Sequence, residues 1–164
     1  PITNWVGFQV YSARQPGARL AGPIPGRVPP AFGHGVVVCS GHGPLICWAE
    51  DDVRAWLARH KPNPQWRWIW HQVARPPKLP ARWTAKSVMG SVAIVIASNA
   101  VVAAGQAPDR SGWIVQALEL SSGRPLWTCS LPAPPLPGGL CIDAHGRILL
   151  VTEAGSVICF DRAG

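Results

Sequence analysis

The chain has 164 residues, of which 48% are hydrophobic and only 14% charged, so one domain with a substantial core is expected and an intrinsically disordered chain is excluded. The longest apolar run, Val92 to Ala97, is too short to cross a bilayer as a helix. The chain contains 17 Gly and 18 Pro residues, which favours many short strands joined by turns.

The formal net charge is +7, but the basic residues are scattered singly, as at Arg14, Arg19 and Arg27. Proteins that bind nucleic acid usually gather such residues on one face or stripe. The charge indicates either an anionic partner or solvated background charges, and we favour the second interpretation. We therefore expect no nucleic-acid partner and no membrane span. The sequence begins at Pro1 with no basic and then apolar signal segment. Either a signal was removed or the chain is a piece of a longer protein, and we favour the second.

The N-terminal stretch is expected to hold two strands. Asn4 to Ala13 alternates apolar and smaller or polar residues, which is typical of a half-buried strand. Gln15 to Gly17 is a turn signal, and Arg19 to Ile24 is the candidate for a short second strand.

Two distant segments align without a gap. Val36 to Trp48 reads V-V-V-C-S-G-H-G-P-L-I-C-W, and Ile148 to Phe160 reads I-L-L-V-T-E-A-G-S-V-I-C-F. Gly43 falls on Gly155, so each copy is predicted to be a hairpin whose three-residue loop ends in Gly, the residue that tolerates positive φ. The pair is an internal repeat, which favours a repeat architecture.

An irregular insertion follows the first copy of the repeat. Glu50 to His60 begins with acidic residues and ends with basic ones, which predicts a short helix. Trp66, Trp68 and Trp70 then recur with period two, so a strand would place all three indoles on one face. They could form an aromatic platform for a sugar or a stacked base, or pack between two sheets, and we favour packing. Arg75 to Pro80 is predicted to be a stiff linker.

The segment Arg82 to Leu131 is the best-formed unit of the sequence. Its predicted strands are Val92–Ser98, Ala100–Gln106, Gly112–Leu120 and Pro125–Leu131. A proline linker, Pro132 to Pro137, separates this unit from the remainder. Three further strands are predicted there: Gly139–Ala144, Arg147–Thr152 and Ser156–Asp161.

Within that unit, Ala117 to Trp127 reads A-L-E-L-S-S-G-R-P-L-W. Two apolar runs flank a Gly-containing turn, which is typical of an antiparallel hairpin. The spacing is Ala-x-acid-x-x-hydroxyl-Gly-base-x-x-Trp. It resembles the repeat signature of the pyrroloquinoline-quinone-type (PQQ-like, or quinoprotein-like) β-propellers, Ala-x-Asp-x-x-Thr-Gly-Lys-x-x-Trp. The alternative is an ordinary hairpin with an outward Trp. The matching positions are, by identity, Ala117, Gly123 and Trp127 and, by chemistry, Glu119, Ser122 and Arg124.

The resemblance implies structural roles for these residues. In that family the motif Trp stacks on the neighbouring blade, so Trp127 is expected to pack across a blade boundary with Ala117 and Gly123. Glu119 and Ser122 are expected to fix the turn by hydrogen bonds.

The implied fold class is all-β, part of a β-propeller built of four-stranded antiparallel blades, with one short helical and Trp-rich insertion. Residues 1–164 would divide into a partial blade at 4–24, a blade at 29–74 with an insertion at 51–64, a blade at 82–131 and a partial blade at 138–162. We expect the C-terminal part of a larger propeller, because an isolated part would leave open edges and apolar faces. Dimerisation and a different all-β sandwich are the alternatives.

The five cysteines show no spacing typical of a zinc site and are expected to be buried free thiols, with a disulfide between adjacent strands left open: Cys39, Cys47, Cys129, Cys141 and Cys159. The five histidines are spread along the chain and form no catalytic pattern: His34, His42, His60, His71 and His145. No phosphate loop or nucleophile elbow occurs.

Quinoprotein dehydrogenases of this superfamily bind the quinone with Ca²⁺ and use a disulfide between adjacent cysteines, and this sequence has no Cys-Cys pair and no evident Ca²⁺ cluster. We therefore expect a non-catalytic scaffold without cofactor. The resemblance implies protein binding in the periplasm or at an exported surface, as in the propeller lipoproteins of outer-membrane assembly. Further partners would be the remaining blades of a longer chain or a second copy. The alternative is a fragment of a PQQ-dependent dehydrogenase, with PQQ and calcium as cofactors.

Overall fold

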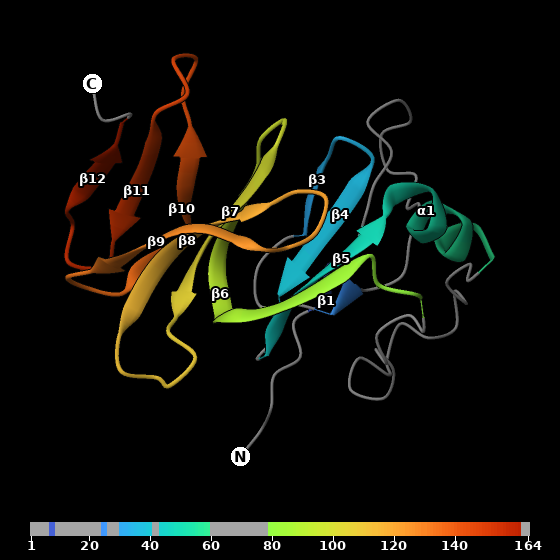
Figure 1. Ribbon diagram of the computed structural model, residues 1–164, viewed down its shortest axis with the longest axis horizontal. Helices are drawn as coiled ribbons and strands as arrows, with labels where there is room; N and C mark the ends of the chain where they lie inside the picture. The colour runs from blue at the N-terminus through green and yellow to red at the C-terminus, as the bar shows by residue number, and fades with distance from the viewer. Residues whose placement is uncertain (1–6, 9–23, 26–29, 41–42, 60–78, 162–164) are drawn as a thin grey trace.

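The structure is a computed structural model that describes residues 7–8, 24–25, 30–40, 43–59 and 79–161 (Figure 1). These residues form antiparallel strands and one short helix, which confirms the all-β fold class. Near the N-terminus, β1 (Gly7–Phe8) pairs with β2 (Ile24–Pro25). The remaining elements are β3 (Ala31–Gly33), β4 (Val36–Ser40), β5 (Pro44–Ala49), α1 (Glu50–Arg59), β6 (Trp83–Ile96), β7 (Ala100–Gln106), β8 (Trp113–Glu119), β9 (Pro125–Leu131), β10 (Pro135–Ile142), β11 (Ile148–Thr152) and β12 (Val157–Phe160).

Strands β3 to β9 form one continuous seven-stranded sheet in sequence order, which bends at β6. The beginning of β6 pairs with β5, as in Leu45 opposite Ala85, and its end pairs with β7, as in Ala93 opposite Ala104. Between them lies Gly90 at φ +51°, a left-handed conformation that Gly adopts without steric cost. The two halves are here called the first sheet (β3–β5 with the beginning of β6) and the second sheet (the end of β6 with β7–β9).

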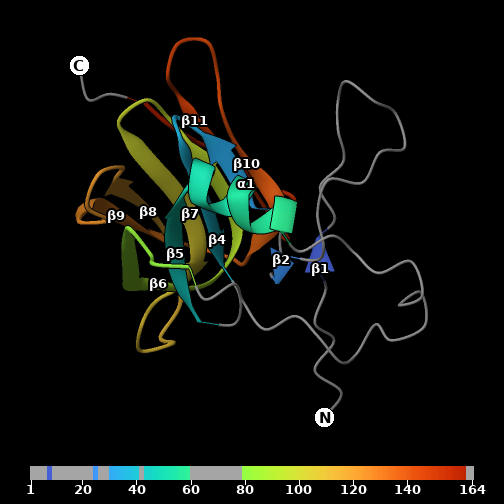
Figure 2. The same cartoon turned by 90° about the vertical axis from the view of Figure 1, so that its right-hand side faces the viewer.

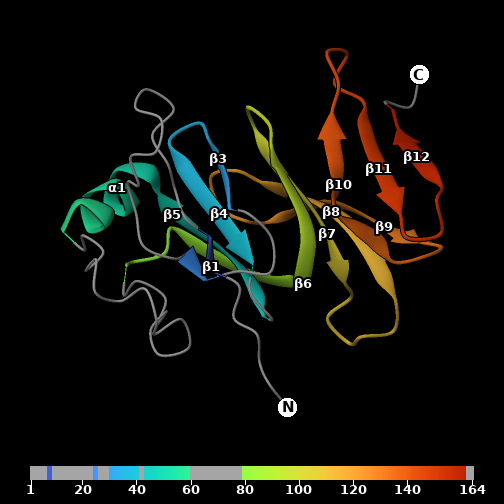
Figure 3. The ribbon, with the colours of Figure 1, turned by 180° about the vertical axis from the view of Figure 1, so that it is seen from behind.

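Strands β10 to β12 form a separate third sheet. The three sheets and α1 follow one another along the longest axis of the molecule, with α1 and the third sheet at opposite ends (Figures 1 and 3). One apolar core lies between the first and second sheets and includes Val38, Cys47, Val88, Ala103 and Leu118. A second core lies between the second and third sheets and includes Val102, Val115, Ala117, Leu140 and Leu150.

Helix α1 covers the face of the first sheet that points away from the second sheet (Figure 2). Its first turn holds Glu50, Asp51 and Asp52 and its last turn Arg59, the distribution that complements the helix dipole. Val53 is buried against the sheet, and Trp56 packs beside it. The short helix predicted from these charges is thereby confirmed.

Two strands begin earlier than the sequence suggested. β6 starts at Trp83, rather than at Val92, because Trp83 and Ala85 are buried while Thr84 and Lys86 are exposed, which is the alternation of a strand. β10 starts inside the expected proline linker, where Pro135 lies opposite Thr152 before a register shift. Proline is tolerated at the first position of a strand.

The strand predicted to carry Trp66, Trp68 and Trp70 lies outside the described residues, as do most of the two N-terminal strands. The described part of the chain includes no helix long and apolar enough to cross a membrane.

Candidate functional site

The motif residues build the turn between β8 and β9. The amide of Glu119 donates to the carbonyl of Arg124 at 2.8 Å, and the amide of Gly123 donates to the carbonyl of Glu119 at 2.8 Å. Gly123 has φ +71°, which a residue with a Cβ adopts only at a cost of about 1–2 kcal/mol. The glycine therefore lets the chain reverse within a few residues.

Three side chains of the motif hold this turn together from the solvent side. The hydroxyl of Ser122 donates to Glu119 Oε2 at 2.5 Å and accepts from the amide of Arg124 at 3.2 Å. The Arg124 guanidinium lies 3.7 Å from Glu119 Oε1. The Ser122 hydrogen bond, with a further contribution from the Arg124 charge, lowers the pKa of Glu119 below its ordinary value. The turn thus favours the ionised carboxylate.

Trp83, at the start of β6, packs on this turn from the first sheet. Its indole Nε1–H donates to the carbonyl of Leu120 at 2.9 Å. A Cβ atom built on Gly123 would lie only 2.6 Å from Trp83 Cδ2 and Cε3. A glycine is therefore required at this position for two reasons, the positive φ and the closeness of the indole. The contact joins the first and second sheets.

Trp127, which the resemblance implied as the docking residue, lies at the boundary between the second and third sheets. It lies opposite Ala117 in the β8–β9 pairing, and its ring centroid is 5.9 Å from that of Phe160 in the third sheet. The three atoms nearest to a Cβ at Gly123 all belong to Trp83. The sequence does hold a signal for Trp83, because Trp83-Thr84 repeats the dipeptide Trp127-Thr128, which lies near the start of the corresponding strand β9.

A chain of polar side chains links the beginning of β6, in the first sheet, to β8 and β9 of the second sheet. Ser87 Oγ donates to Gln116 Oε1 at 2.6 Å, and Gln116 Nε2 donates to Thr128 Oγ1 at 2.7 Å. The side chain of Gln116 is buried, so these bonds satisfy an amide that would otherwise be costly to bury. Nothing in the sequence singles out Gln116, because a lone Gln within a strand carries no pattern.

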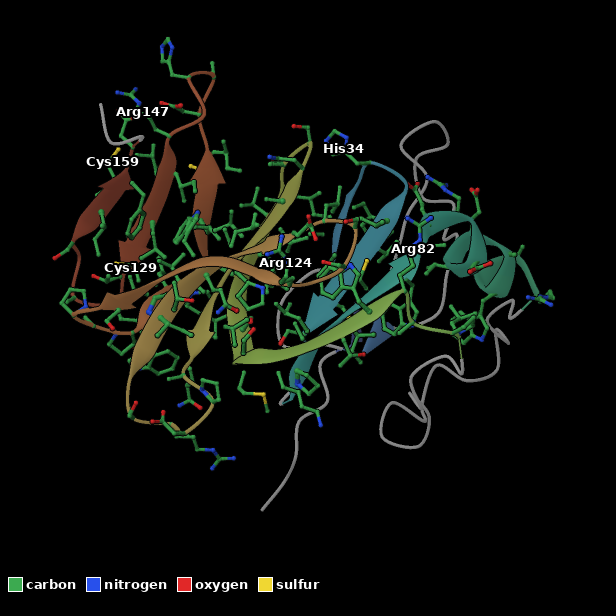
Figure 4. All side chains as sticks on the ribbon, viewed as in Figure 1. His34, Arg82, Arg124, Cys129, Arg147 and Cys159 are labelled. Atoms are coloured by element: carbon green, nitrogen blue, oxygen red, sulfur yellow. The ribbon has the colours of Figure 1, made fainter. Side chains whose placement is uncertain are left out.

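Turns at one rim of the molecule are exposed and polar. They connect β3 with β4, β6 with β7 and β10 with β11, and lie at the top of Figure 1. In the last of them, Asp143 Oδ1 accepts from the amides of His145 and Arg147 at 2.8 and 2.9 Å. The Arg147 backbone bond and side chain lower the pKa of Asp143. His34 stands on the first of these turns, and Figure 4 shows both His34 and Arg147 at this rim.

All five cysteines are free thiols. Cys39 and Cys47 are buried, and burial raises their pKa values to about 12 and about 11. They belong to cores on opposite faces of the first sheet, which keeps them apart although their strands are paired. Contrary to expectation, Cys129, Cys141 and Cys159 are exposed.

No group of three or more His, Cys, Asp or Glu side chains that could hold a metal ion occurs among the described residues.

No protein-family model and no curated protein matches the chain. Among solved structures, the crystal structure of BamB from Moraxella catarrhalis is similar, with a TM-score of 0.52 and 18% sequence identity over 84% of this chain. The fold is that of a β-propeller segment. The chain spans 35% of the length of the BamB chain, about a third.

Proposed function

We propose that this propeller segment is a PQQ-like (quinoprotein-like) repeat scaffold that binds another protein and does no chemistry of its own. The single observation that supports this most is how the motif residues are used. Glu119, Ser122 and Arg124 bond to one another in the turn, and Gly123 receives Trp83. The polar side chains of the motif thus stabilise the turn, and its glycine makes the contact between the two sheets, so neither is left to bind a reacting molecule.

The proposed blades follow the sheets. The first sheet is one proposed blade, with α1 as its insertion, and the second sheet is the next. Strand β6 belongs to both, because its beginning pairs with β5 in the first sheet and its end pairs with β7 in the second. The third sheet provides three strands of another. We propose that the protein is located in the periplasm or at an exported surface. This location rests only on the resemblance of the motif from Ala117 to Trp127.

We propose the rim formed by the β3–β4, β6–β7 and β10–β11 turns as the binding surface. The side chains at their tips are exposed: His34, Ser98, Asn99 and His145. The backbone under them is fixed, since Asp143 holds the third turn by three hydrogen bonds and Ala97 donates to Ala100 across the second at 2.8 Å. Polar groups on rigid turns lose little conformational entropy when a partner binds.

The test is site-specific photocrosslinking in cells that make the native gene product. A crosslinking amino acid at position 145 probes this rim, and one at Arg110, on the exposed β7–β8 loop at the other end of the strands, is the matched control. We expect a discrete crosslink to one protein from position 145 and none from position 110. Equal crosslinking at both positions, or none at either, would contradict the proposal.

A titration with PQQ distinguishes the scaffold from the alternative function, that of a dehydrogenase. A fragment of a PQQ-dependent dehydrogenase predicts that the native gene product binds PQQ stoichiometrically and only with Ca²⁺. Under the scaffold proposal, adding PQQ and Ca²⁺ leaves the quinone absorption spectrum unchanged.

A further inference from the structure

Strand β9 forms the free edge of the second sheet. The seven-stranded sheet ends with it, and among the described strands it pairs with β8 alone. The backbone amides and carbonyls along its other edge therefore have no strand partner among the described residues. The strand lies at the outside of the molecule, and every residue from Pro125 to Ser130 is exposed (Figure 2).

The regular part of this edge is uncharged and flanked by apolar side chains. Trp127 to Leu131 pair with β8 residue by residue, after a register shift that leaves Leu126 as the extra residue. No Asp, Glu, Lys or Arg occurs from Pro125 to Leu131. Leu126 is 46% exposed and Trp127 37%. Soluble proteins usually protect an edge strand with charges, prolines or bulges. Here the proline and the bulge lie only at its beginning, so the five residues that follow are unprotected.

The corresponding strand of the first sheet has the usual protection. The two sequences align on the dipeptide Trp-Thr, as Arg82-Trp83-Thr84-Ala85-Lys86 and Leu126-Trp127-Thr128-Cys129-Ser130. In the first sheet the exposed charges of Arg82 and Lys86 flank the edge. Its regular pairing with β5 is also short, from Trp83 to Ala85. The second sheet therefore has the longer edge and has lost both charges.

Additional sheets of a larger propeller would leave this edge open. The sheets stack face to face, as the two apolar cores between them show. Strand β9 is the last strand of the second sheet, so its free edge points along the sheet and away from both cores. A further sheet would add to a face of the stack and would not pair with β9.

We propose that the free edge of β9 binds an extended, uncharged segment of another protein, which adds to the second sheet as an additional strand. Main-chain hydrogen bonds to β9 hold the segment, and its apolar side chains contact Leu126 and Trp127. A charged segment is disfavoured, because the strand offers no opposite charge to compensate for the loss of hydration. This surface is distinct from the three turns of the rim proposed above.

The size of the edge favours a segment of another protein over a second copy of this chain. Five residues of strand, about 17 Å long in a sheet about 10 Å thick, offer roughly 170 Å². A stable interface between two folded molecules needs about 800 Å² on each side. Pairing of two copies along this edge alone would not hold a dimer, whereas an edge of this size suits a weak and reversible contact with an extended segment.

A phage-displayed library of random heptapeptides, screened against the native gene product, is the probe. We expect the selected peptides to be uncharged, with β-branched or aromatic residues at alternate positions. Leu126→Arg combined with Ser130→Lys gives β9 the charges of the first sheet and should weaken the binding of a selected peptide at least about tenfold. Selection of charged peptides, or of none, would overturn the proposal.

The matched control adds the same two charges elsewhere. Ser111→Arg combined with Ser156→Lys changes exposed loop residues outside β9 and should leave peptide binding unchanged. Thermal unfolding followed by circular dichroism verifies that both double variants are folded. Equal binding of the peptide by the two folded variants would also overturn the proposal.

Methylation of the peptide backbone provides the second measurement. Two versions of a selected peptide are methylated on alternate amide nitrogens, one on the odd and one on the even positions. Because only every second amide of a strand faces a given neighbour, one version should bind at least about tenfold more weakly and the other about as well as the parent. Equal binding of the two versions would show that main-chain pairing does not hold the peptide.

Sedimentation velocity of the native gene product tests the second copy. We expect no dimer that depends on this edge. A concentration-dependent dimer that Leu126→Arg with Ser130→Lys abolishes would overturn the proposal and assign the edge to self-association. None of these measurements involves the rim position 145, so the two proposals fail separately.

Discussion

The indole of Trp83 occupies the space that a side chain at position 123 would need. A Cβ atom on Gly123 would come within 2.6 Å of two ring carbons, and the same indole donates to the carbonyl of Leu120 at 2.9 Å. Trp83 begins β6 in the first sheet and Gly123 lies in a turn of the second. A residue pair forty positions apart in the sequence thus ties the last strand of the first sheet to a turn of the second sheet.

Gly123→Ala is expected to destabilise the protein by about 2–5 kcal/mol, because the positive φ costs about 1–2 kcal/mol and forcing a methyl group into the indole costs about 1–3 kcal/mol. Gly155→Ala is the matched control, since Gly155 has φ +81° and open space around its Cβ position. Denaturant unfolding monitored by circular dichroism measures both. Equal losses would show that the indole contact contributes nothing.

Trp83→Phe is expected to cost about 1–3 kcal/mol, since it removes the donor to the Leu120 carbonyl and leaves that acceptor unpaired in a closely packed joint. Trp127→Phe should cost less, because Trp127 is 37% exposed whereas Trp83 is only 7% exposed. The free energies of unfolding of the two variants, measured side by side, check this. A larger loss for Trp127→Phe would place the stronger joint at the third sheet.

The β8–β9 turn should respond to acid. The pKa of Glu119 is lowered in the folded protein by the Ser122 hydrogen bond and then by Arg124. Its stabilising contribution is therefore fully present above the ordinary carboxyl pKa of about 4.3 and is lost as pH falls through the lower folded value. An NMR titration of the Glu119 side chain should give a pKa that rises in Ser122→Ala. An unchanged pKa in that variant would remove Ser122 as the main cause.

Cys39 and Cys47 should resist thiol reagents in the native protein. Burial raises their pKa values to about 12 and about 11, so almost no thiolate exists at pH 7.5, and the side chains are inaccessible. A chromogenic disulfide reagent should modify Cys129 rapidly and these two only at the rate of global unfolding. Reaction of Cys39 or Cys47 as fast as that of Cys129 would contradict their burial.

Local patterns predicted most of the second and third sheets. Strands β7, β8 and β9 lie close to the expected ranges, because each is a short apolar run bounded by a turn signal. The acidic start of α1 predicted the helix for the same local reason. The sequence did not predict the first half of β6. Its alternation of apolar and polar residues is interrupted by Lys86 and Ser87, and Gly90 is typical of the end of a strand.

The sequence by itself determined the hairpins, the helix and the glycine-containing turn at Ala117 to Trp127, since turn chemistry and side-chain period act between near neighbours. Only the tertiary structure decided which indole meets Gly123. That depends on the bend at Gly90, which turns one 14-residue strand from the first sheet into the second and carries Trp83 to the turn. It also decided which apolar side chains are covered, because α1 packs over one face of the first sheet, whereas Leu126 and Trp127 on β9 are exposed.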